Sequence, residues 1–321
     1  MVSSQIESRI RASNTLQFST LVCFLAVSVV SSTAHAHGTV GKRFFPTTFA
    51  IEDPFVSDEF SLLFGFIEEP AEGGEPAVNE SELEIEFSKR ITDRFAISFG
   101  GALVHLDPDG TSSNTGFRNI EFGIRQQVLT LPDWESVATL QLGFELGDSG
   151  NRDVEAESFS IISPGLFYGI GAGRLPESVS ILRPFALSGF VNADIPTEKR
   201  SAGEKTSVSV SWGFALQYSF EYLQTNVMDF GIPSPLDRFV AIVEFDLQDC
   251  VRRCGGAGTS GSVNPGLIWL GDSFELGLSA RIPINDASGD DPGVFALLHF
   301  FVDDIFPNSL GRPIFHSEPT R

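Results

Sequence analysis

The chain has 321 residues, and its 42 acidic side chains outnumber its 21 basic ones, giving a formal net charge of −21. A chain this negative is repelled by nucleic-acid phosphates, so nucleic acid is excluded as a partner. The 31 glycines and 30 phenylalanines stand against only 3 tyrosines and 3 tryptophans. This composition suits twisted strands that carry bulky rings on one face.

The first 36 residues have the pattern of an export signal. Arg9 and Arg11 give a positive start, a mostly apolar and uncharged stretch follows, and Ala34-His35-Ala36 fits the small-x-small cleavage pattern. A membrane anchor, the alternative, needs about 20 apolar residues and lacks them here. We therefore expect residues 1–36 to be removed. No other apolar run approaches this length, so a mature protein in a membrane must cross it as a closed barrel.

Residues 37–58 show no regular alternation and carry Phe49 and Phe55. Their length and irregular pattern predict an N-terminal plug inside a barrel formed by residues 59–303. A mature chain beginning with His37 also resembles the start of the copper-dependent polysaccharide monooxygenases, in which the terminal amine and imidazole hold copper. The other histidines lack the sequence context for a second ligand. A secreted soluble β-protein with copper at His37 therefore stays as an alternative.

Large apolar and small polar side chains alternate without interruption from Ser207 to Phe220. Successive side chains of a strand point to opposite faces, so one face is apolar and the other polar. This stretch is longer than the roughly 9–11 residues that cross a bilayer at a tilt. The same period recurs and predicts an all-β fold, a transmembrane antiparallel up-and-down β-barrel. Its roughly twelve strands would be 59–66, 80–88, 95–104, 117–128, 137–146, 159–168, 183–191, 207–220, 239–247, 263–269, 274–282 and 294–302.

The connections between these strands alternate in length. If both termini are periplasmic, odd-numbered connections should be long and polar, and even-numbered ones should be short turns. Residues 169–182 and 221–238 are even-numbered connections that break this rule. The second is either a periplasmic flap or conceals a further strand. Residues 304–321, with several prolines, predict a periplasmic C-terminal tail.

Two stretches resemble a known family. Residues 88–97 (S-K-R-I-T-D-R-F-A-I) resemble the G-[IL]-T-[DN]-R turn of outer-membrane proteins similar to the meta-pathway phenol-degradation family, the transporter-like barrels. Residues 264–267 (N-P-G-L), 271–277 (G-D-S-F-E-L-G) and 282–285 (I-P-I-N) resemble that family's late hairpin. Arg90 stands where the turn usually has glycine. The resemblance implies a single-chain barrel that passes small, often hydrophobic compounds, and it assigns no functional residues.

The polar faces of the predicted strands would look into the lumen. An acidic lumen favours cations, as charged rings do in pores. The alternative is that these charges pair across the interior and only hold the barrel's shape. The lumen-lining candidates are Glu82, Glu84, Glu86, Glu121, Arg125, Glu145, Glu244, Asp246, Glu275 and Arg281.

Cysteines, acidic loops and glycines give weaker signals. Cys250 and Cys254 form a candidate disulfide that would close a short loop in an oxidising compartment. The acidic outer loops either collect divalent cations or are solvated, and their irregular ligand spacing favours solvation. No nucleophile elbow or His-x-Ser pairing appears, so we expect no enzyme. Residues 169–173 lack the context of a dinucleotide loop, so they predict a flexible connection and no cofactor.

Together these patterns predict a protein of the outer membrane of a Gram-negative bacterium. Its expected partners are membrane lipid, lipopolysaccharide, the barrel-assembly machinery and an unknown small solute. The first hypothesis is a channel or binding barrel for a hydrophobic or cationic solute. The second is a non-conducting structural or surface-interaction barrel whose own charges close its interior.

Overall fold

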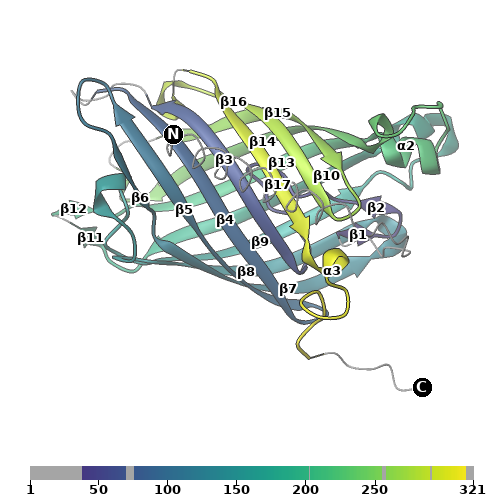
Figure 1. Cartoon of the computed structure of the whole chain (residues 1–321), viewed down its shortest axis with the longest axis horizontal. Helices are drawn as coiled ribbons and strands as arrows, with labels where there is room; N and C mark the ends of the chain where they lie inside the picture. Colours follow the sequence, from purple (N-terminus) through teal and green to yellow (C-terminus); the bar gives the residue numbers. More distant parts are fainter. Residues whose placement is uncertain (1–37, 70–75, 202, 255–257, 290, 316–321) are drawn as a thin grey trace, which may run out of the picture. The chain divides into compact units, whose positions relative to one another are not determined.

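The computed structural model describes residues 38–315 apart from 70–75, 202, 255–257 and 290. The predicted signal and His37 lie outside this part of the chain. Within the described residues, twelve long strands pair antiparallel and close into a barrel (Figure 1). They are β3 (Glu59–Glu69), β4 (Val78–Thr92), β5 (Phe95–Pro108), β7 (Ile120–Leu131), β8 (Ser136–Leu146), β9 (Ile161–Gly171), β10 (Phe185–Pro196), β13 (Val208–Ser219), β14 (Phe239–Arg252), β15 (Thr259–Leu270), β16 (Phe274–Pro283) and β17 (Gly293–Phe301).

Strands that follow one another along the chain are neighbours in the barrel, and β17 closes it by pairing with β3. Every predicted strand has its counterpart within a few residues, so the up-and-down barrel is confirmed. The remaining elements are short. They are β1 (Thr39–Val40), β2 (Arg43–Phe44), β6 (Asn114–Phe117), β11 (Arg200–Ser201), β12 (Glu204–Lys205), α2 (Phe220–Asn226), α3 (Val302–Ile305) and the 3-10 turns Pro132–Trp134, Arg152–Val154, Glu177–Leu182, Leu236–Arg238 and Asp286–Ser288.

The barrel has two distinct ends. Phe301 at the end of β17 lies opposite Glu59 at the start of β3, so the chain enters and leaves at one end, which we call the terminal end. The opposite end, with the connections after β3, β5, β8, β10, β14 and β16, is the loop end. Residues 221–238, all described, lie at the terminal end and form α2 and a 3-10 turn, with no strand among them.

The glycine-rich residues 169–173 differ from their prediction. The structure places residues 169–171 in the end of β9 rather than in a flexible connection. A β-carbon added to Gly169 would lie 2.9 Å from the Phe45 ring, and one added to Gly171 or Gly173 would meet the Glu135 carboxylate. These glycines therefore make room for neighbouring groups inside the barrel, which a search for turn residues does not detect.

The outer face of the barrel is apolar. On β13, Phe214 points outward and stacks on Phe245 of β14 with ring centroids 4.7 Å apart, whereas Ala215 and Gln217 point inward and are buried. Phe99 and Leu278 on other strands keep 51% and 61% of their surfaces exposed. Leaving such rows in water would cost roughly 25 cal/mol per Å² of apolar surface. A hydrocarbon environment removes this cost, which argues against the soluble alternative.

No helix in the described residues has the length and apolar character needed to cross a membrane.

Candidate functional site: the barrel interior

Residues 38–58, called the inner segment below, contact inward-facing side chains around much of the barrel. Phe49 is 3% exposed and Ile51 is 1% exposed. Both pack in one apolar cluster with residues from β9, β10, β13, β14, β15 and β17, all on the terminal-end half of those strands. The wall residues are Phe167, Phe190, Ala215, Val240, Ile242, Ile268, Leu270 and Leu297. The terminal half of the interior is therefore filled by protein.

Two glycines seat the Phe49 ring. A β-carbon on Gly266 would lie 2.7 Å from Phe49 Cε2, and one on Gly277 would lie 2.8 Å from both Cε1 and Cζ. Distances this short do not occur for real side chains, so only glycine lets the ring reach the wall here. Both glycines belong to the late-hairpin stretches singled out in the sequence. Their role in this chain is to accept an aromatic ring of the inner segment.

The wall also pairs with the backbone of the inner segment. An irregular segment inside a barrel needs partners for its peptide groups. The Glu244 carboxylate accepts hydrogen bonds from the backbone N–H groups of Phe49 (3.1 Å) and Ala50 (3.2 Å). The Thr139 hydroxyl donates to the Pro54 carbonyl at 2.5 Å. Glu244 is thus a contact of the inner segment rather than a free charge in open water.

Arg43 anchors the start of the inner segment at the terminal end. Its guanidinium is buried and donates to the Glu135 carboxylate at 3.3 Å and to the Pro184 carbonyl at 2.8 Å. It also lies 3.8 Å from the centre of the Tyr222 ring. Burial lowers the pKa of Arg43, although Glu135 and Tyr222 oppose this shift. The ion pair with Glu135 offsets part of the cost of burying this charge.

Tyr222 completes this anchor. Its hydroxyl donates to Glu135 Oε1 at 2.7 Å. Burial, together with the hydrogen bond to Glu135, raises the pKa of Tyr222 to about 12, so the phenol keeps its proton at neutral pH. The anchor joins the inner segment to three connections of the terminal end.

The loop half of the interior holds a cavity of about 790 Å³. The described residues that line it include seven carboxylates and one ammonium group, Lys205. One of the carboxylates, Glu52, belongs to the inner segment, which therefore contributes to the floor of the cavity. The other carboxylates are Glu84, Glu86, Glu121, Glu145, Glu157 and Asp194. A solute entering from the loop end would thus meet a negative chamber.

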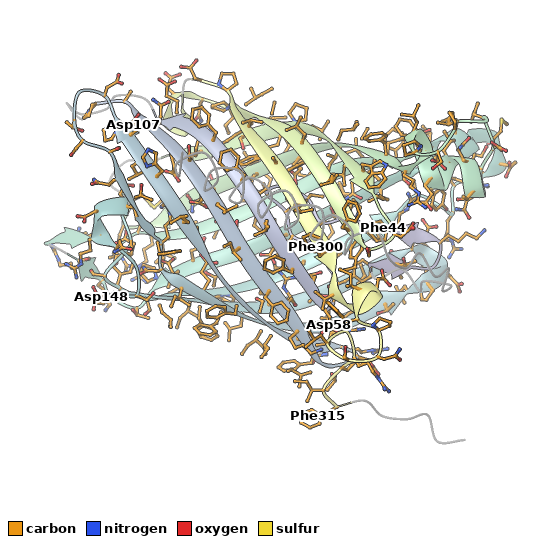
Figure 2. The ribbon with its side chains drawn as sticks, in the orientation of Figure 1. Phe44, Asp58, Asp107, Asp148, Phe300 and Phe315 are labelled. Carbon is orange, nitrogen blue, oxygen red and sulfur yellow. A yellow bond between two sulfur atoms is a disulfide. The ribbon has the colours of Figure 1, made fainter. Side chains whose placement is uncertain are left out.

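Hydroxyl and amide groups form the opposite wall of this cavity. Asp194 of β10 accepts hydrogen bonds from Ser163 at 2.8 Å and from Ser211 at 2.7 Å. Gln248 of β14 donates to Ser209 at 3.2 Å. Neighbouring hydroxyls thus hold the Asp194 carboxylate, and Glu84 and Glu121 line the same cavity from β4 and β7. Figure 2 shows the side chains on the ribbon, with Phe44 and Asp58 of the inner segment labelled.

Apart from Glu82, the predicted lining residues fall into three groups. Glu84, Glu86, Glu121 and Glu145 line the 790 Å³ cavity. Asp246 and Arg281 line a second cavity of about 1440 Å³ at the loop end. Glu82 pairs with Arg118 at 3.2 Å, which itself binds Glu80.

The third group is buried away from the cavities. Arg125 pairs with Glu52 of the inner segment and donates to Gln141 at 2.7 Å. Glu244 contacts the inner segment as described above, and Glu275 is buried opposite His299 of β17. From the sequence, all ten residues are expected to line one lumen. Sequence reasoning missed Arg43 and Glu135, and the close-packed glycines of residues 169–173 were the available signal for a buried contact there.

The cysteine pair lies at the loop end. Cys250 and Cys254 are joined by a disulfide in the structure, with their α-carbons 5.5 Å apart. Among the described residues, no group of three or more His, Cys, Asp or Glu side chains is placed to hold a metal ion. The copper alternative depends on His37, which lies outside the described residues.

Comparisons with known proteins establish the fold. No protein-family model matches the chain, and no curated protein matches it. An outer-membrane channel from Pseudomonas putida F1 aligns with a TM-score of 0.53 at 9% identity, covering 80% of this chain and 99% of the channel. The NanC porin aligns with a TM-score of 0.47 at 8% identity, and the KdgM porin with a TM-score of 0.44 at 6% identity. Each of these alignments covers 75% of this chain and 98% of the porin chain. The fold is a closed barrel similar to that of the outer-membrane channel from Pseudomonas putida F1.

Proposed function

We propose that the protein is an outer-membrane channel for a small cationic solute, and that the inner segment closes the terminal half of its lumen. The observation that carries this proposal is the 790 Å³ cavity, whose described lining has seven carboxylates against one ammonium group and whose floor includes Glu52. A negative chamber in a low-dielectric wall attracts cations and repels anions. The polar lining favours a cationic solute over a hydrophobic one.

Passage in this proposal requires the inner segment to move. Phe49 and the apolar cluster around it fill the lumen below the cavity. Conduction therefore depends on a change in residues 38–57, not on a change in the barrel wall.

The test compares two proteins in planar lipid bilayers. One is the chain from residue 37 onward, and the other lacks residues 38–57. Slow migration on unboiled gels establishes that both barrels have folded. We expect the shortened protein to carry a steady cation-selective current many times that of the longer one. A folded shortened barrel that carries no current would reject the channel.

The second candidate is a non-conducting structural or surface-interaction barrel. The same filling of the terminal half favours it, because a lumen packed with buried side chains needs no transport function. It predicts no current from the chain that begins at residue 37, even if removing residues 38–57 opens the barrel. The two functions therefore differ in the current of the longer protein.

The same proposal includes the cellular context. Residues 1–36 direct export and are removed, and the C-terminal tail lies in the periplasm. The barrel-assembly machinery inserts the protein among outer-membrane lipid and lipopolysaccharide. Cys250 and Cys254 are joined in the oxidising envelope.

A further inference from the structure

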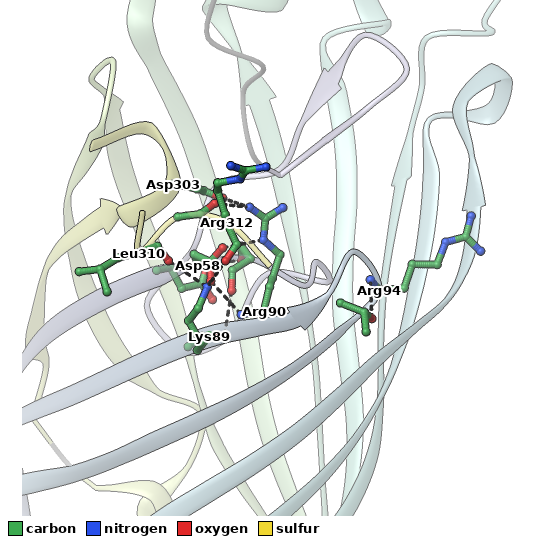
Figure 3. A network of polar contacts seen from close by, with 12 residues as sticks. Asp58, Lys89, Arg90, Arg94, Asp303, Leu310 and Arg312 are labelled. Atoms are coloured by element: carbon green, nitrogen blue, oxygen red, sulfur yellow. Dashed lines mark hydrogen bonds and ion pairs between the residues drawn. The ribbon is translucent and has the colours of Figure 1, made fainter. Parts of the chain in front are cut away.

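The end of the inner segment is held by a second polar cluster, distinct from the Arg43 anchor (Figure 3). Asp58 is fully buried where the chain passes into β3. Its carboxylate accepts hydrogen bonds from the Arg90 backbone N–H at 2.8 Å and from Arg90 Nε at 2.7 Å. Lys89 donates to the same carboxylate. Two adjacent cations of β4 thus converge on one buried anion of the inner segment.

The same two cations hold the C-terminal segment, residues 302–315. Arg90 Nη2 lies 3.1 Å from Asp303 Oδ2 and 2.9 Å from the Gly311 carbonyl. Lys89 Nζ donates to the carbonyls of Leu310 (2.9 Å) and Arg312 (2.7 Å).

Backbone contacts strengthen this junction. The Val302 N–H donates to the Asp58 carbonyl at 2.9 Å. Further along the C-terminal segment, the Phe315 N–H donates to the Ile91 carbonyl at 2.8 Å. The end of the inner segment and the C-terminal segment are therefore joined both directly and through Lys89 and Arg90.

The charges of this cluster depend on one another. The Asp58 and Asp303 side chains are 0% and 2% exposed, so each carboxylate needs a cation to remain charged in the protein. Arg90 bridges both carboxylates with one guanidinium, a geometry that its fork of donors allows and that lysine or glycine cannot reproduce. Displacing the C-terminal segment would remove Asp303 and three carbonyl partners of Lys89 and Arg90, and would loosen these two cations from Asp58.

We propose that the C-terminal segment is a latch that keeps the inner segment inside the barrel, acting through Lys89 and Arg90 on Asp58. The proposal rests on the closed channel described above, because a latch on the inner segment then controls conduction. The Asp58 junction is the releasable end. Its bridging side chains keep 15% and 16% of their surface exposed, whereas the Arg43 side chain keeps only 1%.

If the C-terminal segment only stabilised the barrel end, as a structural cap, losing its contacts would have a different effect from losing a latch. A cap stabilises the barrel end, so its loss would loosen the neighbouring strands. A latch controls the inner segment, so its loss frees residues 45–57 while the strands remain paired. Hydrogen exchange of backbone amides separates these outcomes because it reports opening segment by segment.

The experiment measures amide exchange by mass spectrometry on the full mature chain in lipid nanodiscs. Arg90→Gly removes the bridge and introduces the residue usual in the related family's turn. Arg94→Gly is the matched control, because Arg94 belongs to the same turn and its side chain points away from Asp58 (Figure 3). We expect exchange in residues 45–57 to quicken about tenfold or more in Arg90→Gly, as the loss of hydrogen bonds between charged groups implies. The control should match the parent.

Unchanged exchange in residues 45–57 of a folded Arg90→Gly protein would overturn the latch, as would faster exchange confined to the β4 and β17 ends. If Arg90→Gly does not fold, Asp303→Asn tests the same link, because it keeps the side-chain shape and removes only the ion pair to the C-terminal segment. Faster exchange without any current from the shortened protein would reject the channel and keep the latch. Current from the shortened protein, together with unchanged exchange in Arg90→Gly, would reject the latch and keep the channel.

Discussion

The two halves of the barrel interior are built from the same strands and have opposite character. On β14, the inward side chains Val240 and Ile242 belong to the apolar cluster around Phe49, whereas Asp246 and Gln248 farther along line the cavities. On β10, Phe190 gives way in the same manner to Asn192 and Asp194. The composition of the inward face therefore changes along both of these strands. This change, rather than strand number, determines where the inner segment lies and where water and solute have room.

The comparison also separates two uses of charge. In the terminal half, charged groups such as Arg43 and Glu135 are buried and paired, so they hold the structure together. In the loop half, carboxylates such as Glu84 and Glu121 border a cavity, and under the proposed function they would attract the cation that enters it. The two groups should respond differently to substitution.

The largest effect is expected from Arg43→Met. Removing one partner of a buried ion pair leaves the other charge buried alone and costs about 3–5 kcal/mol. This loss should weaken the attachment of the inner segment, with amide exchange of residues 44–57 faster by about two to four orders of magnitude, which is the same free energy expressed as a rate.

The control for this change is Arg174→Met at the same end of the barrel. Arg174 stacks on Trp134 at 3.9 Å, and that ring is 57% exposed. An exposed contact of this kind contributes about 0.5–1 kcal/mol, and it does not involve the inner segment. Equal exchange in the two variants would show that Arg43 is not an anchor.

A smaller effect is expected from Gly277→Ala. The new methyl group would lie 2.8 Å from Phe49 and 3.2 Å from the Leu297 β-carbon, so the ring must shift. Such overpacking costs about 1–3 kcal/mol. Urea unfolding in lipid vesicles should show this loss, and Phe49→Leu should relieve part of it in the double variant.

Gly143→Ala supplies the matched control. Gly143 lines the cavity of the loop half, and a β-carbon there meets its nearest neighbour, the Ser163 β-carbon, at an ordinary 3.4 Å. We expect nearly unchanged stability. A similar loss of stability in Gly277→Ala and Gly143→Ala would mean that the contact between Gly277 and the Phe49 ring has no special role in stability.

Alternation was sufficient to predict the strands, because a wall between lipid and a polar lumen imposes a period of two on every strand. The stretch from Ser207 to Phe220 shows this most clearly, and the structure places residues 208–219 of it in β13. The same reasoning placed the candidate charges on the inward face. It did not show which of these charges line the cavity and which contact the inner segment. Glu84 and Glu244 have the same local sequence pattern, but Glu84 lines the cavity and Glu244 binds the backbone of the inner segment.

Contacts between distant residues were beyond the sequence pattern. Arg43 meets Glu135 across 92 residues, and Arg90 meets Asp303 through a fold that alternation alone does not position. Arg90 was visible in the sequence only as a departure from a glycine usual at that place. In the structure, this departure supplies the cation that joins Asp58 of the inner segment to Asp303 of the C-terminal segment.

The smallest effect, and the one that tests the loop half directly, is expected from replacing Glu84 and Glu86 together by glutamine. Both line the cavity from neighbouring inward positions of β4, and glutamine keeps their size while removing two charges. The measurement is the ratio of potassium to chloride permeability in the protein that lacks residues 38–57. We expect this ratio to fall by roughly threefold, since other carboxylates of the cavity remain and salt screens each charge. Asp148→Asn is the control, because this carboxylate is exposed in a loop and already pairs with Arg152 at 2.6 Å. A cation preference that survives the double replacement would show that selectivity arises elsewhere in the lumen, and a loss in the control of equal size would assign it to the net charge of the protein rather than to the cavity.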